Sequence, residues 1–286
     1  MKLLVFGRTG QVATELARLA GPELQITCLG REDADLTDPE TCAARIMASD
    51  ADVVINAAAY TAVDKAEDEE ALALAINATA PGAMARAAAA RGVAFLQIST
   101  DYVFDGSRSR PWTPNDPVSP LGAYGRTKLA GEQAVRAAGG SYAILRTSWV
   151  FSAHGANFVK TMLRVGATRD RLTVVDDQHG GPTAAADIAN ALVTIAQAFH
   201  GGKGVTGTFH FAGAPATSWC GFAREIFARV PGEHAPEIAA IPTRDYPTPA
   251  QRPAYSVLDC AKIKDAYGIA QPDWRTTLDR VLAELV

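Results

Sequence analysis

The chain has 286 residues, of which 48 % are hydrophobic, and its 27 basic and 31 acidic side chains give a net charge of −4. This length predicts a large α/β domain with a smaller second one, and the lack of a basic run or of about 20 consecutive apolar residues argues against a nucleic-acid or membrane partner. Four scattered cysteines without CxxC spacing and five histidines without an HxxxH pattern argue against a zinc site or a disulfide framework, so we expect a cytoplasmic protein.

The first elements predict a dinucleotide site. Lys2 to Phe6 is a short apolar run typical of a buried parallel strand. A GxxGxxA turn follows, and then an amphipathic helix. In this layout, glycines let the backbone approach a pyrophosphate at the N-terminus of the helix. The predicted cofactor contacts of this turn are Gly7, Thr9, Gly10, Gln11 and Val12.

The second strand, Leu24 to Leu29, ends at Gly30-Arg31. Folds that select NAD place an Asp or Glu here for the ribose hydroxyls, whereas an arginine can pair with the 2′-phosphate of NADP. Arg31 therefore favours NADPH, with NADH also possible, unless Arg31 is only a solvated loop cation. Asp35 and Leu36 are candidates for the adenine side of the pocket.

Two further strands complete the pattern of the first half. Asp52 to Asn56 leads into small residues that leave room for a cofactor, and the candidates there are Ala57, Ala58, Ala59, Tyr60 and Thr61. Val93 to Ser99 ends in Ser99-Thr100-Asp101, where Ser99 is a cofactor candidate and the other two are substrate candidates. Alternating strands and helices predict a doubly wound parallel sheet whose ligands bind beyond the carboxyl ends of the strands.

Tyr124 and Lys128 lie four residues apart in a predicted helix, so both side chains share one helical face. A lysine ammonium favours the phenolate and lowers a tyrosine pKa from its reference value of about 10. Such a pair can transfer a proton to an oxygen that gains charge. A solvated surface pair is the alternative, but the sheet rule places this helix beside Thr100, which favours a catalytic pair.

These motifs resemble the extended short-chain dehydrogenase/reductases. Five longer strings are similar to one branch of them, the dTDP-4-dehydrorhamnose reductases, and they occupy residues 56–67, 99–106, 123–132, 146–151 and 247–253. The resemblance implies a Rossmann sheet and reduction, by NADPH or NADH, of the C4 ketone of dTDP-4-dehydro-L-rhamnose to dTDP-L-rhamnose. It further implies that Tyr124 donates the proton, that Lys128 holds the nicotinamide ribose and lowers the tyrosine pKa, and that Thr100 hydrogen-bonds the reacting oxygen.

Two other functions stay open for the same fold. One is a nucleotide-sugar epimerase or dehydratase, and the other is a non-catalytic, NADP-binding regulatory subunit. The strings at 146–151 and 247–253 disfavour the first, and the intact set of Thr100, Tyr124 and Lys128 disfavours the second.

The second half carries three candidate contacts to a sugar nucleotide. The resemblance gives this role to Trp149, whose ring offers a flat face; packing at a domain seam is the alternative. Asn157 is a candidate that can equally cap a helix. Arg252 suits a pyrophosphate because its fork meets two oxygens, and a surface ion pair is its alternative. We expect a dinucleotide-binding domain in residues 1–150, with 184–206 returning to it, and a substrate domain mainly in 151–286.

Some members of this branch dimerise through magnesium held by acidic side chains. Glu15 stands at one such place, but residues 183–187 carry alanine where the metal-binding form has glutamate. The sequence therefore predicts no metal, leaves Mg²⁺ uncertain as a cofactor, and is compatible with a monomer or a homodimer.

Overall fold

The computed structural model describes residues 1–230 and 235–285. Its centre is a six-stranded sheet in the order β2-β1-β3-β4-β5-β10, and all neighbouring strands are parallel. The strands are β1 (Lys2–Phe6), β2 (Gln25–Leu29), β3 (Val53–Asn56), β4 (Ala94–Thr100), β5 (Tyr142–Thr147) and β10 (Gly207–His210). Since β1 has β2 on one side and β3 on the other, the topological switch point lies beside β1. The predicted doubly wound sheet is confirmed.

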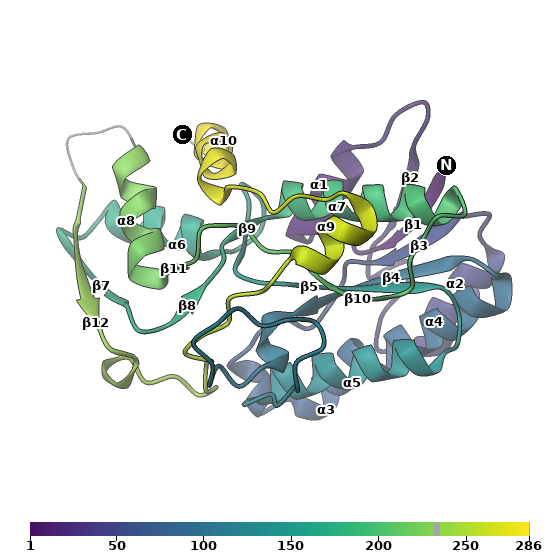
Figure 1. Ribbon diagram of the computed structural model, residues 1–286, viewed down its shortest axis with the longest axis horizontal. Helices are drawn as coiled ribbons and strands as arrows, with labels where there is room; N and C mark the ends of the chain where they lie inside the picture. The colour runs from purple at the N-terminus through teal and green to yellow at the C-terminus, as the bar shows by residue number, and fades with distance from the viewer. Residues whose placement is uncertain (231–234, 286) are drawn as a thin grey trace.

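Helices cover both faces of this sheet (Figure 1). One face carries α1 (Gln11–Arg18), α7 (Ala185–His200) and α9 (Ala261–Tyr267); the other carries α2 (Pro39–Ala48), α3 (Glu70–Leu74), α4 (Ala80–Arg91) and α5 (Ala123–Ala137). Alternate residues of β1 supply the two cores, because Leu3 and Val5 pack under α1 and α7 while Leu4 and Phe6 pack under α2 and α4. A strand buried on both sides has to be apolar throughout, as the sequence of β1 is.

A smaller lobe lies beside one end of the sheet (Figure 1). It contains α6 (Phe158–Gly166), α8 (Trp219–Arg229), α10 (Trp274–Leu285) and three strand pairs: β6 (Val150–Phe151) with β9 (Thr183–Ala184), β7 (Arg171–Val175) with β12 (Glu237–Ile241), and β8 (His179–Gly180) with β11 (Thr217–Ser218). Its core is built around Phe151, Phe222 and Trp274. The division of the chain at residue 150 stays a prediction.

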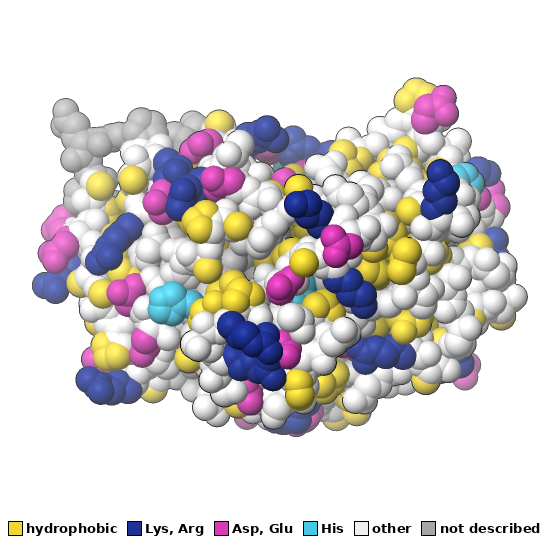
Figure 2. Space-filling view, viewed as in Figure 1, with side chains coloured by type: hydrophobic (Ala, Val, Ile, Leu, Met, Phe, Trp, Pro, Cys, Tyr) yellow, Lys and Arg dark blue, Asp and Glu magenta, His cyan; other side chains and the backbone are white. Residues whose placement is uncertain are grey.

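Four short helical turns complete the described chain: η1 (Lys65–Glu67), the π-helical η2 (Ala75–Thr79), η3 (Asp101–Val103) and η4 (Thr243–Asp245). Basic and acidic side chains are interspersed over the face drawn in Figure 2, rather than gathered by sign. Within the described residues, no helix has the length and apolar character needed to cross a bilayer.

Candidate active site

The loops that follow β1 and β3 meet at the switch point. Gly7 has a φ of 117°, which favours glycine, and a Cβ there would lie 3.4 Å from the backbone of Ala57 and 3.3 Å from Cβ of Ala13. Gly10 is the N-cap of α1 and offers no side chain to its first turn. The N-cap residue therefore leaves the first amide groups of α1 without a side-chain cap, as suits an anion site at a helix N-terminus.

The predicted cofactor residues differ in how accessible they are. Thr9, Gly10 and Thr61 are exposed, and residues 57–60 and Gln11 are half-buried along the edge of the sheet. Val12, on α1, is buried in the core. Ser99 is also buried, and its hydroxyl donates to the Glu132 carboxylate at 2.6 Å.

Two arginine side chains lie near the end of β2: Arg31, which follows β2 in the chain, and Arg8, which follows β1 and donates to the Cys28 carbonyl. The exposed Arg31 donates from Nε to Asp35 at 2.9 Å, and Asp35 also accepts from the amide of Thr37, while Leu36 is buried in the core. Arg8, which the sequence did not single out, pairs with both Glu32 and Asp33. Each arginine thus has a carboxylate partner, and a role for Arg31 in the choice between NADP and NAD stays a prediction.

Thr100, Tyr124 and Lys128 come together where β4 ends and α5 begins. The Thr100 hydroxyl accepts from the amide of Tyr102 at 3.1 Å and donates to Asp101 Oδ1 at 3.0 Å. The Tyr124 ring packs edge-on against Tyr102, with 5.7 Å between ring centroids. Lys128 is 3 % exposed, and its Nζ donates to the Ile98 carbonyl at 2.7 Å.

The pKa values at this cluster correct one expectation. Burial raises the pKa of Tyr124 to about 12, against a hydrogen bond with Thr100 that lowers it, and the nearby Asp101 adds to the rise. Burial also lowers the pKa of Lys128 to about 8, against the opposing charge of Glu132. The expectation that Lys128 depresses the tyrosine pKa is wrong for this structure, because desolvation dominates at both groups and the ammonium is bonded to Ile98.

A buried ionic cluster joins α5 to β5. Glu132 is fully buried and accepts from Arg146 Nε at 2.8 Å, from Arg146 Nη2 at 2.7 Å and from Arg136 at 2.7 Å. His210 completes the cluster: its Nδ1 lies 2.9 Å from the carbonyl of Trp112 and its Nε2 lies 3.4 Å from Arg146. Sequence reasoning missed this cluster, although the spacing of four between Lys128 and Glu132 puts both on one face of the helix.

The sequence also did not reveal Asn77, which lies in the π-helical turn η2. Its Oδ1 accepts from the amide of Tyr60 at 2.9 Å, and its Nδ2 donates to the Tyr60 carbonyl and to Thr127 Oγ1, both at 3.1 Å. A Cβ on Gly131 would clash with the Asn77 backbone. Asn77 thus joins the loop after β3 to α5, and a π-turn at a functional site is a common association.

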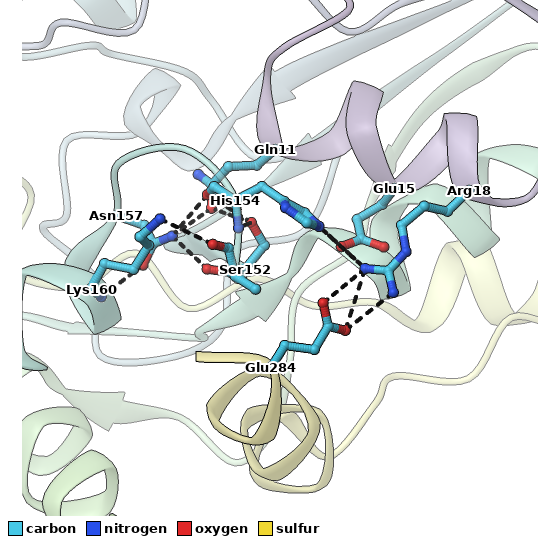
Figure 3. A network of polar contacts seen from close by, with 9 residues as sticks. Gln11, Glu15, Arg18, Ser152, His154, Asn157, Lys160 and Glu284 are labelled. Atoms are coloured by element: carbon cyan, nitrogen blue, oxygen red, sulfur yellow. Dashed lines mark hydrogen bonds and ion pairs between the residues drawn. The ribbon is translucent and has the colours of Figure 1, made fainter. Parts of the chain in front are cut away.

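Two of the predicted substrate contacts have protein partners. Asn157 caps α6 by accepting from the amide of Lys160 at 3.1 Å, and its Nδ2 donates to Gln11 at 2.9 Å (Figure 3). Arg252 forms a bidentate pair with Asp64, at 2.9 and 2.8 Å. The alternatives of a helix cap and an ion pair therefore both occur, and contact of these side chains with substrate stays a prediction.

Trp149, the third substrate candidate, adopts a strained backbone. Its φ of 47° lies in the left-handed region, which a bulky residue enters only when its surroundings enforce it. The ring stacks on Trp219 with 3.5 Å between centroids, and a Cβ on Gly180 would clash with it. Trp149 thus packs within the smaller lobe, but its side chain is only half-buried.

The surroundings of Glu15 do not fit a metal site. Arg18 lies between the carboxylates of Glu15 and Glu284, and His154 Nε2 is 3.3 Å from Glu15 (Figure 3). The Arg18 guanidinium already pairs with both carboxylates at this position. In the described part of the chain, no cluster of three or more His, Cys, Asp or Glu side chains is arranged to hold a metal.

Comparison with known proteins gives matches over the whole chain. The sequence model described as "RmlD substrate binding domain" matches residues 1–286. A dTDP-4-dehydrorhamnose reductase from Burkholderia thailandensis is 45 % identical, with 100 % of this chain and 99 % of that protein covered. One from Escherichia coli K12 is 38 % identical, covering 100 % and 98 %.

Solved structures agree with these matches. The dTDP-4-dehydrorhamnose reductase of Clostridium acetobutylicum superimposes with a TM-score of 0.93 at 38 % identity, covering 100 % of this chain and 99 % of that one. The Bacillus anthracis enzyme, solved in complex with NADP, gives 0.92 at 32 % identity, covering 99 % of each chain. The resemblance seen in the five sequence strings is confirmed: this chain belongs to the dTDP-4-dehydrorhamnose reductase family and is an oxidoreductase.

Proposed function

We propose that this enzyme reduces the C4 ketone of dTDP-4-dehydro-L-rhamnose, with NADPH or NADH as the reductant, and releases dTDP-L-rhamnose. The observation that carries the proposal is the convergence of Thr100, Tyr124 and Lys128 at the carboxyl end of β4. Relatives with up to 45 % identity over their full length carry the name of this reaction. That agreement supports the same substrate here.

The cofactor is proposed to lie across the switch point of the six-stranded sheet. The close approach of Gly7 to Ala57 and the uncapped start of α1 suit a pyrophosphate there. The NADP complex of the Bacillus anthracis relative supports this choice of cofactor class. When bound, the nicotinamide supplies the hydride.

The protein supplies the proton. Tyr124 is proposed to donate its phenolic proton to the C4 oxygen, and its raised pKa keeps it fully protonated at neutral pH. Thr100 is proposed to hydrogen-bond the same oxygen, so that two donors meet the charge that develops there. Lys128, with a pKa of about 8, stays largely charged at pH 7, and we propose that its ammonium binds the nicotinamide ribose.

The sugar nucleotide is proposed to lie between this lobe and residues 151–286. Asp101 and Trp149 are candidate sugar contacts, and Arg252 is a candidate for the pyrophosphate. Asp64 holds the Arg252 fork at the border of the two lobes, so a diphosphate would compete with that carboxylate or share the guanidinium with it. Asn157 is proposed to act on the substrate side while it caps α6.

The direct test is oxidation of NADPH, and separately of NADH, by the pure protein with dTDP-4-dehydro-L-rhamnose made in situ from dTDP-glucose. We expect ketone-dependent oxidation and formation of dTDP-L-rhamnose. Tyr142→Phe is a matched control, because Tyr142 begins β5 and lies at the opposite end of the strands from Thr100. Tight NADPH binding without any oxidation would contradict the proposal and favour a regulatory role.

A further inference from the structure

Asp101 is one of three residues in the described part of the chain that have a buried side-chain polar atom without a hydrogen-bond partner. It is 2 % exposed, directly follows Thr100, and opens η3 at the carboxyl end of β4. Its Oδ1 accepts the Thr100 hydroxyl at 3.0 Å, but its Oδ2 is buried without a hydrogen-bond partner within the described residues. Buried carboxylate oxygens are nearly always paired, so an unpaired one beside reacting groups calls for a functional explanation.

The Thr100 hydroxyl has one proton and two competing acceptors. It already accepts from the Tyr102 amide at 3.1 Å, so its own proton goes either to Asp101 or towards Tyr124 and the oxygen proposed to react there. An ionised Asp101 only accepts hydrogen bonds and holds the Thr100 proton. A protonated Asp101 can instead donate to Thr100, which frees the Thr100 proton to point into the site.

We propose that Asp101 is a positioning residue that decides where Thr100 donates: in its neutral form it turns the Thr100 hydroxyl towards the substrate carbonyl, and in its ionised form it turns that hydroxyl away. This inference rests on the proposed reduction of a ketone at Thr100 and Tyr124. It requires no covalent change at Asp101, only the exchange of donor and acceptor within one hydrogen bond.

The electrostatic surroundings allow this switch to operate near neutral pH. Burial raises the pKa of Asp101 to about 6, although the Thr100 hydroxyl and the nearby Ser256 hydroxyl act to lower it. The titratable groups that face it are Tyr102 on η3 and Tyr124 on α5, both with raised pKa values and hence neutral. Arg252 and Asp64 act on the Tyr102 phenol with opposite signs.

The test is the pH profile of kcat/KM for ketone reduction in the wild type and in Asp101→Asn. In the wild type we expect a fall above about pH 6 that approaches tenfold per pH unit as the neutral form is lost. In D101N the amide nitrogen can donate to Thr100 at every pH, so this fall should be absent. Asp187→Asn is the matched control, because burial also raises the pKa of Asp187, which lies on α7 and accepts from Thr277; it should keep the wild-type profile.

Other results for D101N would overturn the proposal. An unchanged fall with a higher KM would make Asp101 a simple substrate contact. Loss of turnover at every pH, with NADPH binding retained, would make it a proton donor in its own right. If D101N does not fold, Thr100→Val serves instead: its turnover is lower, but the fall near pH 6 should disappear, because no Thr100 proton remains to be directed, and a persisting fall would contradict the proposal.

A measurement without turnover separates this inference from the proposed function. The carboxyl ¹³C signal of Asp101, identified by its absence in D101N, should titrate with a midpoint near pH 6 in the wild type and higher in Thr100→Val, since Thr100 lowers that pKa. A midpoint below pH 4, or one that Thr100→Val leaves unchanged, would overturn the inference even if the enzyme reduces the ketone. If the wild type and Thr100→Val show these two midpoints but the wild type does not reduce the ketone, the proposed function alone is contradicted.

Discussion

Two buried polar clusters lie against neighbouring turns of α5, and they are built in opposite ways. Around Glu132, both carboxylate oxygens are paired with Arg146, and Ser99 and Arg136 add further bonds. Around Thr100, one carboxylate oxygen of Asp101 has no partner in the described chain, and the pKa of Tyr124 is raised by burial. This difference suits two different roles. The first cluster is complete within the protein and stabilises the fold, whereas the second is left open for a ligand to complete.

The variant Tyr124→Phe is the strongest test of the difference between the two clusters. Only a hydroxyl is lost, so we expect kcat for ketone reduction to fall by roughly 10²–10⁴-fold, the range that general acid catalysis supplies, while NADPH binding is retained. Stopped-flow or steady-state oxidation of NADPH measures the loss, and thermal denaturation should show little change in Tm. A variant with near-wild-type turnover would remove Tyr124 from the role of proton donor.

Glu132→Gln should instead destabilise the fold. Arg146 is 2 % exposed and would keep a buried charge without its partner, which typically costs about 3–5 kcal/mol of unfolding free energy. The matched control is Glu70→Gln, which breaks a bidentate pair between Glu70 on α3 and Arg126 on α5. That pair is 44–45 % exposed and should contribute less than about 1 kcal/mol. Equal losses in chemical denaturation would contradict the contrast drawn between the clusters.

The supporting cluster should also make the fold sensitive to acid. Burial, reinforced by Arg146, lowers the pKa of His210 to about 3. Below pH 6.5 the unfolded chain binds a proton at this histidine that the folded chain cannot bind, so stability is lost as pH falls from about 6.5 towards 3. At pH 4 the loss should be about 3 kcal/mol.

Urea denaturation at pH 7 and pH 4 measures this loss. His210→Asn keeps a donor for the Trp112 carbonyl and should lower the pH dependence, whereas the exposed His200→Gln should not. A pH dependence that is the same in all three proteins would show that other groups set the acid sensitivity.

The smallest effect is expected far from both clusters, at the end of β2. Arg31 is 79 % exposed and paired with Asp35, so Arg31→Ala should lower kcat/KM for NADPH by only about 3–10-fold, equivalent to about 1 kcal/mol, and leave NADH unchanged. The ratio of the two cofactor efficiencies is the measurement. Equal losses with both cofactors would mean that Arg31 does not read the 2′-phosphate, and Arg8→Ala would then be the variant to examine.

The sequence was most informative where a function depends on local order along the chain. A glycine turn between a strand and a helix, and a tyrosine and a lysine four residues apart, identify their elements without any knowledge of distant residues. The sheet rule then places Thr100 next to α5. The fold class and the family followed from such patterns, and both are confirmed by the structure and by the full-length relatives.

Sequence reasoning failed where partners lie far apart in the chain. Arg146 and Glu132 are recognised as a pair only once β5 is known to lie against α5, and Asn77 reaches Tyr60 only through a π-turn that no propensity indicates. The prediction of a lowered pKa for Tyr124 was wrong for the same reason, because the spacing of Tyr124 and Lys128 does not indicate how deeply the site is buried. Burial is a property of the whole fold, not of a motif.

The path of the chain through its two lobes has a consequence for exchanging parts between relatives. After β5 the polypeptide builds part of the smaller lobe, returns as α7 and β10 to complete the sheet, leaves again for α8, and comes back once more as α9, which packs on β10 and α7. A fragment that ends before residue 207 therefore lacks the edge strand of the sheet. A chimera that takes its substrate lobe from another family member needs several junctions at once, so the two lobes are expected to be inherited, and to evolve, as one unit.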